Sequence, residues 1–373
     1  MLATGAAGAP TMLVGAAEDA PKQYDLLSAL AAADLARLAG FRAIRLTAQW
    51  TRGATRPGAH EMRSLRNAVD AAGLRGLKVL VAISSSGSRT TPRTSAQRRT
   101  FAAYAAAVAE ELPEVGHIVV GNEPNLNRFW MPQFSQSGEN AAAPAYTKLL
   151  AATYDALKDV RRDIVVIGGA ISSHGADDPK APRHTQSPTR FIPAMGAAYR
   201  ALRRERPIMD AFALHPYLLS SRRPPTVKHP NSTTVTIADY PKLVRLLERA
   251  FAGTAQPGSE LPIYYAEYGV QSRIPRRKHG LYVHRRARAA RDAVSERTQG
   301  RYYRQALALA ACQPTVAGFF VFHVQDERDL RRWQSGVYYA DDTPKSSLRL
   351  VRTAISKLHA GKLTRCGAGA GHR

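Results

Sequence analysis

The feature that most constrains the fold of this sequence is a regular alternation of short apolar runs with longer helical patterns. The apolar runs occupy residues 12–16, 43–50, 78–84, 117–123, 164–170, 209–217, 261–269 and 316–324. Each run is followed by a stretch with the apolar spacing of an amphipathic helix. Repeated strand–helix units of this kind predict an α/β protein with a parallel sheet.

The helical patterns lie at residues 26–40, 61–72, 101–112, 146–160, 191–203, 240–253, 299–312 and 346–358. The apolar runs lack strict alternation, as expected for parallel strands that helices cover. Eight such units predict one (β/α)8 barrel over residues 12–358, with flexible termini at 1–11 and 359–373. A doubly wound sheet is the alternative, but its first turn is usually rich in glycine, whereas this chain has "GAAEDAPK" there.

The net charge of the chain gives only a weak indication of its binding partners. The 373 residues include 53 Lys and Arg against 29 Asp and Glu, a formal net charge of +24. Such a charge attracts polyanions such as nucleic acid, an acidic cell-wall polymer or anionic lipid, but a compositional bias toward Arg and Ala explains it equally. No nucleic-acid-binding motif accompanies the charge, so we expect no specific nucleic-acid partner. No apolar run approaches the roughly 20 residues of a membrane span.

The chain has two cysteines, Cys312 and Cys366, and neither belongs to a CxxC pair. This spacing gives no reason to expect a structural metal site. A disulfide that attaches the C-terminal tail to the body would fit an oxidising compartment, and two free thiols are the alternative. No signal peptide is visible at the N-terminus.

Active sites of such barrels lie where the strands end, at the carboxyl face. Polar side chains at or near these ends are Arg45, Asn122, Glu123, His215, Tyr217, Glu267 and His323. Glu123 and Glu267 end the fourth and seventh runs, so we expect them on nearly opposite walls of one mouth. Two facing carboxylates suit glycosidic bond cleavage, in which one donates a proton and the other attacks or stabilises the anomeric carbon. A structural pair that binds arginines at the barrel rim is the alternative.

The two motifs resemble those of clan A glycoside hydrolases, the retaining barrel enzymes that include families 5 and 39. Asn122-Glu123-Pro124 is similar to the acid/base motif at the end of strand four, and Ala266-Glu267-Tyr268-Gly269 to the nucleophile motif of strand seven. His215-Pro216-Tyr217 resembles the His-x-Tyr of strand six in family 5, and Arg45 its strand-two arginine. The resemblance covers residues 12–358.

The resemblance implies a role for each of these residues. Glu123 would be the general acid and then the base, and Glu267 the nucleophile. Asn122 would bind the sugar hydroxyl next to the anomeric carbon. Arg45 and Tyr217 would keep Glu267 ionised, and His215 would be a polar wall or a partner of these groups. The alternatives are a plain ion pair for Arg45 and a satisfied core histidine for His215.

Aromatic side chains near the strand ends are candidates for stacking on sugars. Family 5 enzymes commonly end strand eight with such a Trp, whereas this chain has His323 there, and Trp333 in the next loop is the candidate replacement. Trp50 and Trp130 are further candidates, for which packing in the protein is the alternative. Asp326 and Glu327 read as a solvated loop, with a calcium or sugar-hydroxyl site as the alternative.

Together these patterns predict a retaining O-glycoside hydrolase that cleaves a β-linked, possibly acidic, oligo- or polysaccharide without a cofactor or metal. An inactive carbohydrate-binding protein on a barrel scaffold is the alternative, and a polyanion-binding protein is a third hypothesis. The substrate class and the cysteines lead us to expect an extracellular or cell-wall location.

Overall fold

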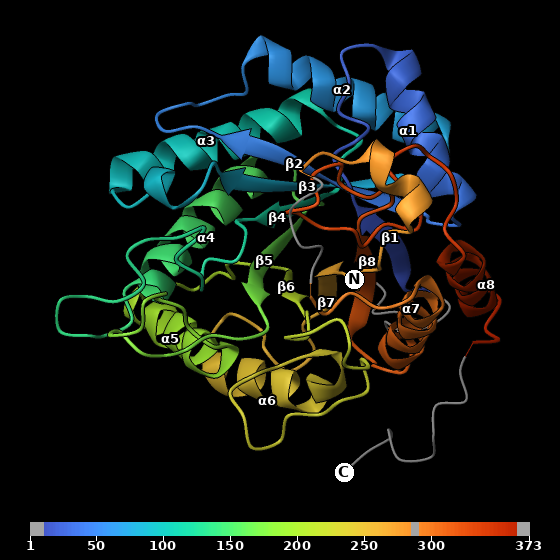
Figure 1. Cartoon of the computed structure of the whole chain (residues 1–373). Helices are drawn as coiled ribbons and strands as arrows, with labels where there is room; N and C mark the ends of the chain where they lie inside the picture. Colours follow the sequence, from blue (N-terminus) through green and yellow to red (C-terminus); the bar gives the residue numbers. More distant parts are fainter. Residues whose placement is uncertain (1–10, 285–290, 364–373) are drawn as a thin grey trace.

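A closed barrel of eight parallel strands forms the centre of the molecule in the computed structural model, which describes residues 11–284 and 291–363 (Figure 1). The strands are β1 (Leu13–Ala17), β2 (Ala43–Trp50), β3 (Lys78–Ser85), β4 (His117–Val120), β5 (Val165–Ser172), β6 (Ala211–His215), β7 (Ile263–Tyr268) and β8 (Val316–Phe322). Each strand pairs with the next in the sequence, and β8 closes the ring on β1. The barrel prediction is confirmed, and the doubly wound sheet is excluded.

Helices surround this barrel on the outside, as the view in Figure 1 shows. They are α1 (Leu26–Leu38), α2 (Ala59–Leu74), α3 (Ser95–Glu111), α4 (Ala142–Val160), α5 (Pro188–Ala201), α6 (Tyr240–Phe251), α7 (Glu296–Ala311) and α8 (Ser347–His359). Helix α1 ends just before Gly40, whose φ of +91° favours glycine. The strands β4, β6, β7 and β8 end one to three residues before their predicted limits.

Two separate apolar clusters fill the space inside and outside the barrel. The inner cluster consists of small and branched side chains with two large rings, and includes Ala43, Leu80, Ala82, Val119, Ile167, Ala170, Ala211, Ala213, Tyr264, Ala266 and Phe320. The outer, larger cluster lies between the strands and the helices. Alternate residues of each strand therefore point inward and outward, and both faces are buried.

Long loops follow β7 and β8 at the carboxyl face, and the loop after β8 contains a buried ion pair. Lys345 Nζ lies 2.7 Å from Asp326 Oδ1, and both side chains are completely buried. Tyr282, in the loop after β7, donates a hydrogen bond of 2.8 Å to the same carboxylate. Asp326 is thus a buried structural residue that binds Lys345 and Tyr282. It does not belong to a solvated loop or a calcium site.

In residues 11–284 and 291–363 no helix is long and apolar enough to cross a membrane. The predicted flexible termini lie mostly outside these residues, as does Cys366. The disulfide between Cys312 and Cys366 therefore stays a prediction.

Candidate active site

The end of β4 places Glu123 at the carboxyl mouth through a sharp turn. Gly121, with φ of +87°, donates its N–H to Ile83 O at 2.8 Å, and Glu123 itself has φ of +39°. The Glu123 N–H is bonded to Ala170 O of β5 at 2.8 Å. Buried Asn125 completes the turn by bonding Ser172 and the loop after β5. Backbone contacts to the two neighbouring strands therefore hold the carboxylate in position.

A bulge in β7 places Glu267 in the same mouth. Tyr265 pairs with Phe319 and Tyr268 with Val321, so three residue steps on β7 face two on β8. Both tyrosines belong to the outer cluster, while Ala266 belongs to the inner one. With strict alternation, the Glu267 side chain would point out of the barrel, as that of Tyr265 does. The extra β7 residue in the bulge makes the Glu267 side chain point into the barrel mouth instead.

His215 connects the two carboxylates. Its Nδ1 lies 3.3 Å from Glu123 Oε1 and 3.6 Å from Glu267 Oε2. Because one atom is the common reference, these two oxygens are no farther apart than the two distances together, about 6.9 Å. The structure thus brings the two predicted glutamates together, and His215 is a partner of both rather than an independent core histidine.

Glu267 is held in an ionised state by several groups. Burial raises its pKa most strongly among the individual effects, but His215, the Arg45 guanidinium and the Tyr217 hydroxyl together lower the pKa below its ordinary value. Arg45 forms a buried ion pair with Glu267 Oε1, and Tyr217 donates to Oε2 at 3.1 Å. Both residues therefore lie where the resemblance to clan A implies.

Three further polar residues at this face were not predicted. Burial lowers the pKa of His174, and the charge of Glu123 acts against this shift. Ser173 donates to Tyr217 O at 2.5 Å, and Glu18 accepts from the N–H groups of Val324 and Gln325. Ser173 and His174 follow β5 directly, and Glu18 follows β1. All three could therefore have been predicted from the rule that active sites lie at strand ends.

One wall of the mouth is aromatic. The Trp333 ring lies 5.0 Å from the Tyr217 ring and 5.8 Å from Phe322. His323 binds Ala17 O through Nδ1 at 2.9 Å, and its Nε2 lies 3.9 Å from Glu327. Trp333 thus packs against Tyr217, whose hydroxyl binds Glu267, whereas His323 is directed toward β1 and Glu327.

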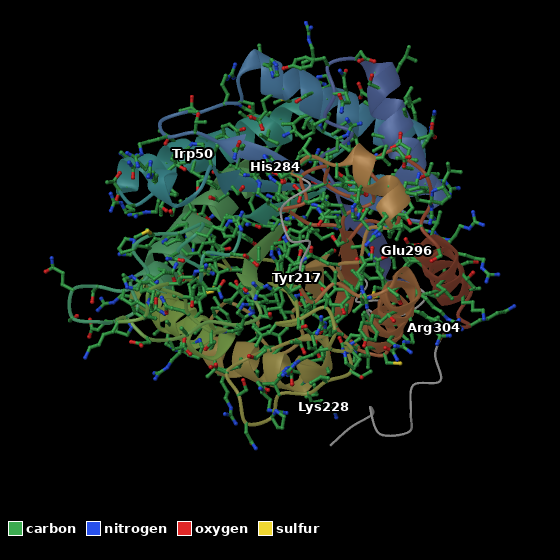
Figure 2. The ribbon with its side chains drawn as sticks, in the orientation of Figure 1. Trp50, Tyr217, Lys228, His284, Glu296 and Arg304 are labelled. Atoms are coloured by element: carbon green, nitrogen blue, oxygen red, sulfur yellow. The ribbon has the colours of Figure 1, made fainter. Side chains whose placement is uncertain are left out.

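Trp50 and Trp130 lie inside the protein. Trp50 is completely buried against Phe101, and its Nε1 donates to Ala54 O at 2.8 Å. Trp130 is 4% exposed and packs edge-on against Tyr146. In Figure 2, Tyr217 lies near the centre of the view and Trp50 toward the outer helices. Burial excludes both tryptophans as sugar platforms, so the packing alternative holds for them.

Asn122 is partly buried beside Glu123, with no side-chain hydrogen bond among the described residues. Its amide is therefore available to a ligand. Within the same described part of the chain, no group of three or more His, Cys, Asp or Glu side chains could hold a metal ion.

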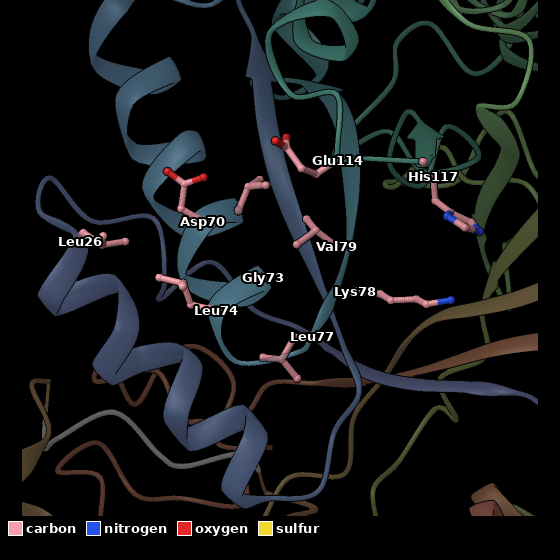
Figure 3. A pocket seen from close by; sticks show the side chains of 11 residues that line it. Leu26, Asp70, Gly73, Leu74, Leu77, Lys78, Val79, Glu114 and His117 are labelled. Carbon is pink, nitrogen blue, oxygen red and sulfur yellow. The ribbon is translucent and has the colours of Figure 1, made fainter.

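A large cavity lies away from this site. It measures about 770 Å³ and lies where β3 and β4 begin, next to α2; the lining residues labelled in Figure 3 include Asp70, Leu74, Lys78, Glu114 and His117. A smaller, polar cavity of about 230 Å³ lies at the carboxyl face, between the loops after β6 and β7, and Trp333 lines it. Neither glutamate lines either cavity, but Tyr268 and Gly269, which follow Glu267 in the chain, line the smaller one.

Searches of protein-family models and of curated protein sequences find no match to this chain. Solved structures do match. A family 39 glycoside hydrolase from Bacteroides cellulosilyticus WH2 is 20% identical with a TM-score of 0.65, over 94% of this chain and 64% of that one. GH5_18 from Streptomyces cattleya, solved with GlcNAc, is 17% identical with a TM-score of 0.60, over 94% and 81%. The GH39 enzyme from Xanthomonas axonopodis pv. citri is 17% identical with a TM-score of 0.58, over 95% and 67%. At these identities the likeness establishes the barrel fold.

Proposed function

We propose that this protein is a retaining O-glycoside hydrolase that acts on a β-linked oligo- or polysaccharide. The observation that carries the proposal is the position of Glu123 and Glu267 around His215 Nδ1, at 3.3 and 3.6 Å. The resulting limit of about 6.9 Å between their oxygens lies near the bottom of the roughly 6.5–9.5 Å range typical of inverting enzymes and allows the about 5 Å of retaining ones.

In the first step, a Glu267 oxygen attacks the anomeric carbon while Glu123 gives its proton to the glycosidic oxygen. The bond between that carbon and that oxygen breaks, and the leaving sugar departs with the proton. In the second step, Glu123 takes a proton from water, whose oxygen attacks the anomeric carbon and releases Glu267. The two carboxylates supply the acid, the base and the nucleophile, so the proposed reaction requires no cofactor.

The surrounding groups fit these roles. The Arg45 ion pair and the Tyr217 hydrogen bond favour the ionised Glu267 that attack requires. We assign Asn122 to the sugar hydroxyl next to the anomeric carbon and Trp333 to a sugar face. His215 has a buried Nε2 without a hydrogen-bond partner, so its link to the protein's polar groups runs through Nδ1, toward the carboxylates.

The test is hydrolysis of aryl β-glycosides and β-linked glycans by the wild type and by two variants. The panel includes β-mannosides, because structures similar to this chain were solved with Manβ1-4GlcNAc. We expect Glu267→Gln to lower the turnover rate by several orders of magnitude. Glu123→Gln should lose about 10²–10⁴-fold on natural glycans but much less on aryl glycosides with good leaving groups, which need no proton.

The anomer formed first, followed by NMR, distinguishes retention from inversion. Turnover that persists in Glu267→Gln would contradict the nucleophile assignment. Binding of a glycan without turnover in the wild type would favour the inactive carbohydrate-binding alternative.

A further inference from the structure

The mouth that holds Glu123 has a strongly basic edge over β2, β3 and the start of α3. It carries seven arginines, called here the arginine rim: Arg52, Arg56, Arg89, Arg93, Arg98, Arg99 and Arg128. All are exposed except Arg98, which is partly buried. Residues 51–58 and 86–100 contain no Asp or Glu.

Hydrogen bonds connect the segments that carry five of the seven rim arginines. The guanidinium of Arg52 donates to Arg89 O, and Ser88 N donates to Arg128 O at 3.2 Å. Arg98 Nη1 donates to Arg93 O at 2.5 Å. Figure 1 shows the loop after β2 running past α3. Backbone and side-chain contacts therefore bring Arg52, Arg89 and Arg128 from three loops to one edge. The guanidinium groups of Arg52 and Arg98 are themselves held by hydrogen bonds.

The described residues do not neutralise the positive charge of the rim. Among the described residues, none of the seven arginines lies within 4.0 Å of a carboxylate, and their hydrogen bonds go to backbone carbonyls and to Ser95. By contrast, Arg66, Arg75 and Arg204 on other parts of the barrel each bind an acidic side chain. A set of adjacent unpaired guanidinium groups is suited to several anionic groups on one ligand.

The position of the rim indicates the kind of ligand. Arg128 lies five residues after Glu123, so the rim shares a loop with the proposed acid/base residue. Single-stranded nucleic acid is usually bound by a basic groove with exposed aromatic rings. The rim offers none in the described structure, because Phe101 and Trp130 are buried and Phe129 lies under the Arg128 guanidinium.

We propose that the arginine rim binds carboxylate or sulfate groups of an anionic polysaccharide whose scissile bond reaches Glu123 and Glu267. This inference rests on the proposed glycosidase function, since it names the substrate class of the same mouth. The guanidinium groups would hold sugar units on the Glu123 side of the cleft, where the leaving group departs.

The test compares two four-fold Arg→Gln variants of the full chain. The rim variant combines Arg52→Gln, Arg89→Gln, Arg93→Gln and Arg128→Gln. The control variant combines Arg245→Gln, Arg249→Gln, Arg301→Gln and Arg304→Gln, which lie exposed and without ion pairs on α6 and α7. Both variants lose the same charge. Thermal unfolding verifies that both are folded.

Binding of heparin, alginate, an uncharged β-mannan and a short single-stranded DNA is measured by calorimetry at low and moderate salt. We expect the rim variant to bind heparin or alginate at least about tenfold more weakly than wild type, and the control less than about twofold. Added salt should weaken wild-type binding to these anionic glycans, and binding of the uncharged glycan should be the same in all three proteins.

Equal weakening in both variants would show a general effect of net charge and overturn the proposal. So would DNA binding that is tighter than glycan binding and depends on the rim. Hydrolysis of the same glycans by wild type and Glu267→Gln is measured separately. Rim-dependent glycan binding together with no turnover of any member of the β-glycoside panel would contradict the glycosidase function while leaving the rim as a glycan-binding surface.

Discussion

Glu267 shows how single residues adjust a catalytic group. Its carboxylate is only 12% exposed, which alone would favour the neutral acid. Four partners reverse this effect and lower the pKa: His215, Arg45 and, more weakly, His323 through charge, and Tyr217 through a hydrogen bond to the ionised form. The position is therefore suited to an ionised nucleophile and unsuited to a proton donor.

This environment predicts the acid limit of activity. The pKa of Glu267 lies below its ordinary 4.5, so the attacking anion is present above that pKa and is lost as pH falls through it. We expect the acid limb of kcat/KM to lie below pH 4.5 in the wild type. Tyr217→Phe removes a hydrogen bond to the anion, so it should move the limb to higher pH. Tyr24→Phe, which changes an exposed hydroxyl bonded to His60, is the control. An unchanged limb in Tyr217→Phe would contradict this role.

The loops after β7 and β8 show what stabilises the site at the level of elements. Asp326 and Lys345 form an ion pair that is completely buried. Burial raises the pKa of Asp326 and lowers that of Lys345, so each charge depends on the other. Gly336 N–H and Tyr282 OH bind the same carboxylate and connect both loops to it.

Lys345→Met leaves a buried carboxylate without its cation and should lower the free energy of unfolding by about 3–5 kcal/mol. The double variant Asp326→Leu/Lys345→Met should recover most of this loss, because no charge remains unpaired. Lys278→Met breaks a partly exposed pair with Asp341 and should cost under about 1 kcal/mol. Urea unfolding measures all three. A double variant as unstable as Lys345→Met would show that the carboxylate is not what destabilises the single variant.

At the scale of the whole molecule, the formal charge of +24 opposes compaction. Added salt screens this repulsion, since the Debye length shortens to about 8 Å near 0.15 M. We therefore expect the midpoint of thermal unfolding to rise between low salt and about 0.15 M. Different monovalent salts should give the same rise at equal ionic strength. A midpoint that falls with salt would mean that favourable ion pairs outweigh the repulsion.

The alternation of apolar runs and helical patterns predicts the barrel and most element positions, because each element follows from local periodicity. β2 is found over the predicted residues, Ala43–Trp50. β4 instead stops at Val120, since the positive φ of Gly121 turns the chain before Glu123. The expectation of Glu123 and Glu267 in one mouth needs only the parallel strand order, because the carboxyl ends of all strands meet at one face.

The sequence by itself thus determined the strand order and the strand ends that carry chemistry. Tertiary structure decided which side chains face the site. The bulge in β7 turns Glu267 inward against the alternation of its strand, and a bulge depends on pairing with β8, which no local pattern contains. Trp50 ends β2 and Trp130 lies in the loop after β4, yet both are buried, against α3 and α4. The direction of an aromatic ring depends on the helix packed beside it, and that contact exists only in the folded chain.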